Sequence, residues 1–408
     1  MPFTTGAAQE AYALGDGLLR KGGRRLFPIG FYELPREDAE LERMASSGIN
    51  LVCCHSREDL DRVHAAGMMG WLPLPLHEGA TDALRQAVEA VKDHPALAVW
   101  EGPDEIVWTF TLWRGLEQKA GIRRSDWWEQ TPKAVEYAEA EARRIVPNLR
   151  EAIRLVRELD QNNHQIWINE ARSSDVKFVR QYADYIDITG CDDYPIQKTM
   201  RSIARLGGCT ERWRMVGRGK PVWMVLQAFS PTGLSRPPDP SPPVYPSFAE
   251  SRFMAYAVIA HGASGVLYWG SEHDAVRDPN FRDSLYALTS ELAALQPFLV
   301  APEEREPKVA LIEGEEEEQQ TRGVKMTVRR NGREWLIALV NEDERRHMGV
   351  EVSGLESING LRLDLLHGTE TATVERGGFV TRMQPYEVKA FATGREWETA
   401  IRKGRDFH

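Results

Sequence analysis

The sequence has little cysteine and no excess of positive charge. Only four of its 408 residues are cysteines, and Cys53 and Cys54 are adjacent in an apolar run, so buried free thiols are expected rather than a disulfide framework. Lys and Arg total 51 against 61 Asp and Glu, a formal net charge of -10. Because no basic stripe offsets these acids, nucleic acid and anionic membrane are excluded as the expected main partners.

The sequence also has no membrane-spanning segment, signal peptide or zinc-binding motif. No apolar stretch is long enough to span a membrane, and the start Met1-Pro2-Phe3 lacks the basic and apolar regions of a signal peptide. We therefore expect a cytoplasmic protein from the sequence as given, or a periplasmic or secreted one if a signal peptide has been removed. No Cys/His spacing suggests zinc, so we expect neither a metal nor a cofactor.

What the sequence does contain is an alternation of short apolar runs with longer amphipathic segments. The expected strands are 26–32, 50–54, 69–74, 97–100, 165–169, 185–189, 222–227 and 265–269, and the clearest helices are 36–46, 57–66, 82–92, 135–159 and 248–261. Eight strands separated by helices predict an α/β fold, a (β/α)8 TIM barrel. An open doubly wound sheet is the competitor, but no glycine-rich phosphate loop follows the first strand.

After Leu299 the alternation of strand-like and helix-like segments ends, and short strand-like runs follow one another. The strand-like runs there are 308–312, 324–328, 335–340, 349–352, 361–365 and 387–391, and Asn331-Gly332 is a strong hairpin signal. These features predict a small all-β sandwich. We therefore divide the chain into a barrel at 1–300 with a lead-in at 1–24, a sandwich at 301–395 and a tail at 396–408. The acidic run Glu315 to Glu318 is expected to be a solvated loop.

The fourth apolar run, 97–100, continues as Glu101-Gly102-Pro103-Asp104-Glu105. Burying an unpaired carboxylate is costly, so acids at the end of a buried strand face a partner or an open site. In a (β/α)8 barrel the carboxyl ends of the strands carry the catalytic residues. This segment therefore predicts a site with carboxylate chemistry.

Together these motifs resemble the clan A glycoside hydrolases, barrels that are often followed by a small β-sandwich. The resemblance implies that Glu105 is the general acid/base at the end of strand four, with Asp104 where the clan usually has Asn. It also covers Tyr194 after strand six and Trp269 at the end of strand eight, positions that contact the sugar or orient the nucleophile. The implied partner is an oligo- or polysaccharide.

Strand seven departs from the clan. The nucleophilic Glu is expected there, but the chain reads Val225-Leu226-Gln227. An amide is not a usable nucleophile, so the usual double displacement cannot be built from Glu105 and Gln227. Four explanations stay open: an inverting reaction with another carboxylate as base, attack by an acetamido group of the substrate, sugar binding without cleavage, and an engineered Gln227. A lyase reaction is a further alternative.

The candidates for a second acid come from three other strand ends. We prefer Asp192 and then Glu272, because Asp192 and Tyr194 are two residues apart and point to the same side of an extended segment. The remaining candidates are Asp193, Glu170 and Asp274. The predicted catalytic residues are therefore Glu105 and Asp192, and the predicted substrate contacts are Asp104, Tyr194, Gln227, Trp269, Glu272, His77 and Asn169.

Two connections are longer than a barrel needs. Residues 106–132 contain four tryptophans and follow Glu105, and residues 228–247 are rich in proline. Long loops after barrel strands build substrate sites, although irregular surface cover is the alternative for both.

Overall fold

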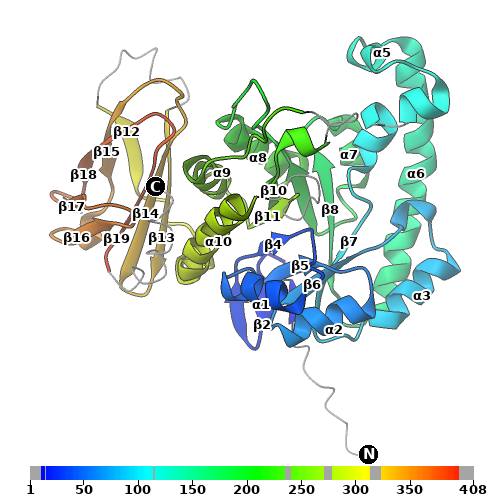
Figure 1. Cartoon of the computed structure of the whole chain (residues 1–408), viewed down its shortest axis with the longest axis horizontal. Helices are drawn as coiled ribbons and strands as arrows, with labels where there is room; N and C mark the ends of the chain where they lie inside the picture. Colours follow the sequence, from blue (N-terminus) through cyan, green and yellow to red (C-terminus); the bar gives the residue numbers. More distant parts are fainter. Residues whose placement is uncertain are drawn as a thin grey trace, which may run out of the picture. The chain divides into compact units, whose positions relative to one another are not determined.

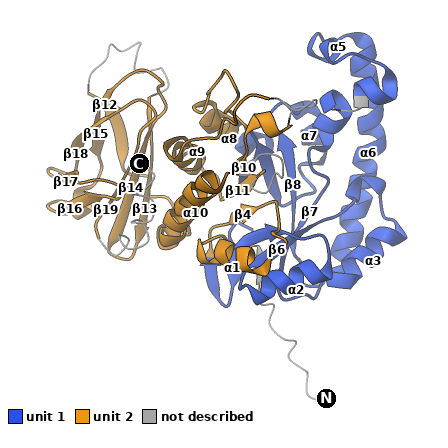
Figure 2. Ribbon diagram, in the orientation of Figure 1, with its two compact units in different colours: residues 1–25, 50–193, 212–225 blue, residues 26–49, 194–211, 226–408 orange. Residues whose placement is uncertain are grey.

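A computed structural model describes residues 11–13, 15–113, 115–234, 240–270, 278–312 and 323–394 of the chain. Its contacts divide the chain into two compact units, which are coloured separately in Figure 2. The first unit comprises residues 1–25, 50–193 and 212–225, and the second comprises 26–49, 194–211 and 226–408.

Eight parallel strands form a closed barrel in the order β10-β11-β4-β5-β6-β7-β8-β9 (Figure 1). They are β4 Ile29–Phe31, β5 Leu51–Cys53, β6 Met69–Pro73, β7 Leu97–Glu101, β8 Gln165–Ala171, β9 Ile188–Asp192, β10 Val222–Gln227 and β11 Gly265–Trp269. The predicted (β/α)8 fold is confirmed. Several predicted boundaries differ, and two of these differences concern the site: β8 runs two residues further, and β9 both starts and ends three residues later. Glu170 therefore lies within a strand, and Asp192 ends one.

Several helices begin where a side chain caps the free N–H groups of the first turn. Ser56 accepts from the N–H of Asp59 before α2, and Thr81 accepts from that of Leu84 before α3. The main helices are α1 Asp38–Ser46, α2 Arg57–Ala65, α3 Asp82–Val91, α6 Pro132–Leu159, α7 Val176–Tyr182, α8 Arg205–Val216, α9 Phe248–Ala260, α10 Pro279–Ala294 and α11 Gln296–Leu299. Among the described residues no helix is both long and apolar enough to cross a bilayer.

Large aromatic side chains from alternate strands fill the barrel interior. Trp71 of β6 contacts Trp167 of β8 edge to face at 5.7 Å, and Trp167 contacts Trp223 of β10 at 5.3 Å. Gly190 of β9 makes room for this layer, because a Cβ there would lie 2.3 Å from the Trp167 ring nitrogen. Trp223 donates its indole N–H to Gly17 O. Gly17 lies in the turn between β1 Ala11–Ala13 and β2 Leu19–Lys21, which form an N-terminal sheet together with β3 Arg24–Leu26.

The C-terminal part of the second unit contains two antiparallel sheets, in the orders β12-β15-β18 and β13-β14-β19-β16-β17. Their strands are β12 Lys308–Leu311, β13 Val324–Asn331, β14 Glu334–Asn341, β15 Met348–Ser353, β16 Arg362–Leu365, β17 Thr371–Thr373, β18 Phe379–Met383 and β19 Val388–Ala392. The predicted sandwich and its Asn331-Gly332 hairpin are confirmed, although β17 and β18 were not predicted. The run 315–318 and the tail 396–408 lie outside the described residues.

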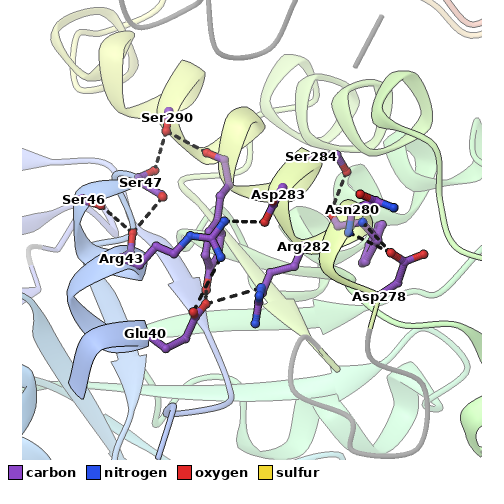
Figure 3. A network of polar contacts seen from close by, with 12 residues as sticks. Glu40, Arg43, Ser46, Ser47, Asp278, Asn280, Arg282, Asp283, Ser284 and Ser290 are labelled. Carbon is purple, nitrogen blue, oxygen red and sulfur yellow. Dashed lines mark hydrogen bonds and ion pairs between the residues drawn. The ribbon is translucent and has the colours of Figure 1, made fainter. Parts of the chain in front are cut away.

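Within the second unit, polar contacts join α1 to α10 (Figure 3). Arg43 pairs with Asp283, and the Thr289 hydroxyl donates to Ser47 O at 2.8 Å. Gly48, with φ of +88°, ends α1 so close to α10 that a Cβ would lie 2.2 Å from the Ala293 Cβ. Glycine meets both demands, because it tolerates a positive φ and brings no Cβ.

The Gly48→Ala substitution is therefore expected to lower the free energy of unfolding by about 1–3 kcal/mol through overpacking, in addition to the cost of the positive φ. Gly67→Ala is the matched control: Gly67 follows α2 with φ of +75°, and a Cβ added there would meet no other atom within 4 Å. Urea unfolding of both variants measures the difference. Equal destabilisation would contradict the proposed packing constraint between α1 and α10.

Candidate active site

The turn after β7 places Glu105 in a left-handed backbone conformation, with φ of 48° and ψ of 42°. Only glycine and a few other residues adopt this region easily, and holding a glutamate there costs about 1–3 kcal/mol. Two backbone hydrogen bonds maintain it: Glu105 N donates to Asn169 O at 3.0 Å, and Thr109 N donates to Glu105 O at 2.8 Å. The carboxyl-bearing residue is therefore held at a defined place beside β8.

Asn169 of β8 joins two acids of the first unit. Its side-chain amide nitrogen donates one hydrogen bond to Asp104 Oδ1 and another to Asp192 Oδ2, each at 3.0 Å. The amide oxygen Oδ1 is buried and has no hydrogen-bond partner among the described residues. A buried acceptor of this kind is satisfied when a ligand brings a hydroxyl or an N–H group.

Glu105 and Asp192 are hydrogen-bonded to each other through their carboxyl groups. Burial and the charge of Glu105 raise the pKa of Asp192 well above its usual range, and burial also raises the pKa of Glu105. Two carboxylates in contact cannot both ionise easily, so the pair holds one proton between them. Asp192 is only 5% exposed, whereas Glu105 is half-buried, so Glu105 is the member of the pair that solvent reaches.

Asp104 adds a third carboxyl group to this cluster. Its pKa is raised by the protein atoms around the carboxyl group and by the negative charge of Glu105, and the hydrogen bond from Asn169 opposes the rise. Part of the Asp104 residue is exposed to solvent. The three acids therefore form one electrostatic unit in which adding or removing a proton at one group changes the others.

Glu170 lies on the opposite face of β8 from Asn169. Its carboxylate accepts from Ser174 Oγ and Tyr182 OH, both at 2.6 Å, and from Val107 N at 3.0 Å. Burial raises the pKa of Glu170 to about 7, although these three hydrogen bonds oppose the rise. The sequence offered Glu170 as a possible second acid, but its carboxylate points toward α7 and is only 1% exposed.

The tryptophan-rich segment after Glu105, for which a substrate-site loop and irregular surface cover were the two alternatives, is largely helical. It contains α4 Ile106–Trp108, two π-helical turns at Thr109–Trp113 and Gly115–Lys119, and α5 Arg124–Trp128. Trp108 and Trp113 stack on each other with centroids 4.9 Å apart. Trp127 is buried, whereas Trp128 is 61% exposed, so this segment combines packing and solvent-facing tryptophans.

In the second unit, three aromatic rings follow the ends of β9, β10 and β11. Tyr194 lies 5.5 Å from Trp269, and Phe229 lies 5.0 Å from both rings. The structure thus brings together two predicted substrate contacts, Tyr194 and Trp269. It adds Phe229, which was not singled out as a site residue; its position two residues beyond a strand end was the only signal in the sequence.

Gln227 also lies in the second unit and is fully buried. Its Oε1 accepts from Ile196 N at 2.9 Å, and its Nε2 donates to Ile196 O at 2.9 Å and to Phe229 O at 3.1 Å. The two carbonyl acceptors require a donor at this position. A carboxylate would meet both carbonyl oxygens without a hydrogen to share, so the amide suits this backbone as it stands.

The remaining predicted site residues are His77, Asp193, Glu272 and Asp274. His77 lies in the 3-10 turn η1 Leu76–Glu78 after β6, and burial lowers its pKa. Asp193 forms an ion pair with Arg172 at 3.4 Å. Glu272 and Asp274 lie outside the described residues. In the part of the chain that the structure describes, no group of three or more His, Cys, Asp or Glu side chains is arranged to hold a metal ion.

No family model and no curated protein sequence matches the chain, but solved structures do. A β-galactosidase from Bacillus circulans sp. alkalophilus is 10% identical with a TM-score of 0.54, and the match covers 90% of this chain and 99% of that one. A glycoside hydrolase family 5 protein from Bacteroides vulgatus is 14% identical with a TM-score of 0.52, covering 95% and 92%.

A further match is a β-galactosidase from the psychrophilic Marinomonas ef1, 14% identical with a TM-score of 0.44 over 66% of this chain. The chain spans 60% of that protein's length. At these identities the likeness concerns the fold. The chain thus has the same overall fold as the first two solved structures, the glycoside hydrolase family 5 protein and the Bacillus circulans β-galactosidase.

Proposed function

We propose that the protein hydrolyses a glycosidic bond, with Glu105 as general acid and Asp192 as the buried carboxyl group that shares its proton. The observation that carries this proposal is the direct hydrogen bond between the two carboxyl groups. A general acid must still hold its proton near neutral pH, and ordinary carboxyl groups do not. Burial raises the pKa of Glu105, and the pair retains its last proton because losing it would leave two touching negative charges.

We assign the proton donor and its supporting group from the solvent exposure of the two carboxyl groups. Glu105 is the solvent-facing member, so it donates to the glycosidic oxygen, while Asp192 stays behind it and is held by Asn169. As the proton moves from Glu105 to the leaving group, negative charge develops on the pair. The hydrogen bond from Asn169 to Asp192 then stabilises that charge.

Asp192 acts through Glu105 in this arrangement. An inverting pair needs about 6.5–9.5 Å between its carboxyl groups to admit a water, and a retaining pair needs about 5–5.5 Å to admit the anomeric carbon. Two carboxyl groups in hydrogen-bond contact meet neither distance. The attacking group is therefore a water activated by another base, for which Glu272 is the sequence candidate, or an acetamido group of the substrate.

The substrate class follows from the groups available for contact. Asn169 Oδ1 is a buried acceptor for a hydroxyl group. In the second unit, taken by itself, Tyr194 and Trp269 are partly exposed and pack around the buried Phe229, and aromatic faces of this kind are ones on which the apolar faces of sugar rings pack. We therefore propose an oligo- or polysaccharide as the substrate.

The Glu105→Gln variant is expected to lose about 10²–10⁴-fold in kcat, because an amide cannot donate the proton of a general acid. Reducing-end release from oligosaccharides that the unmodified protein cleaves measures the loss. Asp160→Asn is the control, because Asp160 is another buried carboxyl group, bonded to Trp100 and His164. Activity of Glu105→Gln close to that of the control would refute the role of Glu105.

The Asp192→Asn variant tests the sharing of the proton. In the unmodified protein, activity is expected to fall as pH rises through the raised pKa of the pair. An asparagine removes the negative neighbour and can donate to Glu105, so the pKa of Glu105 falls. The alkaline limb of the kcat/KM profile should then move to lower pH by about one unit or more. A limb that stays in place or moves to higher pH would contradict the assignment.

A second candidate function is sugar binding without cleavage, and the observation that favours it is Gln227. The strand end where a nucleophile is expected carries an amide whose hydrogen bonds all go to the main chain. Titration calorimetry with a panel of oligosaccharides, read beside reducing-end release, separates the two functions. Binding without product supports the second candidate, and turnover eliminates it.

A further inference from the structure

We infer that Glu170 is a positioning residue for Glu105, which sets the backbone of the turn that carries the proposed acid. Its importance for catalysis rests on the proposed function, but its structural action does not. Glu170 touches none of the groups assigned to the reaction. It acts on the backbone two residues beyond Glu105, through the hydrogen bond from Val107 N at 3.0 Å.

The turn is held from both faces of one strand. Successive side chains of a strand point to opposite faces, so Asn169 faces the acid cluster and Glu170 faces the helix layer. The side-chain NH2 of Asn169 donates to Asp104, and its main-chain carbonyl oxygen accepts from the Glu105 N–H. Glu170 binds the Val107 N–H from the other side. Residues 104 to 107 are therefore fixed by two consecutive residues of β8.

The Glu170 carboxylate is itself held by the elements around it. Tyr182 at the end of α7 and Ser174 in the turn before α7 each donate a hydrogen bond of 2.6 Å. Phe178 of the same helix packs edge to face on Phe110, with ring centroids 5.5 Å apart. The strained left-handed conformation of Glu105 thus depends on a carboxylate that is anchored by α7.

The experiment compares Glu170→Ala with Glu170→Gln and with Asp160→Ala in the full-length protein. Glutamine keeps the size of the side chain; its oxygen can accept from Val107 and Tyr182, and its NH2 can donate to Ser174 Oγ. Asp160→Ala removes another buried carboxylate with several donors, near the opposite end of β8. It therefore controls for general destabilisation.

Two readouts are taken. Amide hydrogen exchange in residues 105–113 should accelerate about tenfold or more in Glu170→Ala, and this should not happen in Glu170→Gln or Asp160→Ala. In the same variant, kcat should fall about 10–100-fold while KM changes less than about threefold, because the acid is misplaced rather than removed. Glu170→Gln should restore kcat to within about threefold of the unmodified protein.

Unchanged exchange in Glu170→Ala, or equal acceleration in Asp160→Ala, overturns the inference, and so does a failure of glutamine to rescue. If Glu170→Ala does not fold, Tyr182→Phe replaces it, because the loss of one donor should accelerate exchange in the same segment. The two proposals can fail separately. If exchange accelerates in Glu170→Ala and returns to normal in Glu170→Gln, the positioning role of Glu170 stands. If Glu105→Gln is nevertheless active, the proposed function is refuted.

Discussion

The organisation of the candidate site depends on the pleat of one strand. Because Asn169 and Glu170 are consecutive in β8, their side chains leave opposite faces, and both bind the turn that follows β7. That turn holds Glu105 in a conformation that glutamate avoids when it is unsupported. The strain, the contact of Glu105 with Asp192 and the order of the following helical segment all depend on these two residues of β8.

The same arrangement explains the electrostatics of the site. Asp104, Glu105 and Asp192 are crowded around a single amide group, which offers only two hydrogens. The carboxyl groups therefore compete for these hydrogens, and binding a proton reduces the repulsion between their negative charges. A cluster that destabilises its own ionised state is well suited to donating a proton to a substrate, which is the chemistry proposed for Glu105.

Much of this could be predicted from the chain, and the exceptions have physical causes. The apolar runs located all eight barrel strands, because burial on both faces leaves a continuous apolar signal. The end of β8 was predicted two residues too early, because Glu170 is charged and breaks that signal, although it is buried and hydrogen-bonded. The connection 106–132 was predicted only as a long loop, because its helices are short: each of the four helical segments described there has five residues or fewer. Gln227 was read as a missing nucleophile and a substrate contact; its hydrogen bonds to Ile196 and Phe229 could not be predicted, since they involve backbone atoms of other segments.

By itself, the sequence determined the barrel, the following β-sandwich and the acidic end of β7, because these follow from the period of apolar residues and the cost of burying charge. The tertiary structure alone decided which acids meet. The spacing to Tyr194 favoured Asp192 over Glu170 as the second acid, but both are acids near strand ends and the sequence did not show which side chain meets Glu105. One side chain enters the acid cluster and the other enters the helix layer, because a strand's pleat and exact length set the direction of each residue.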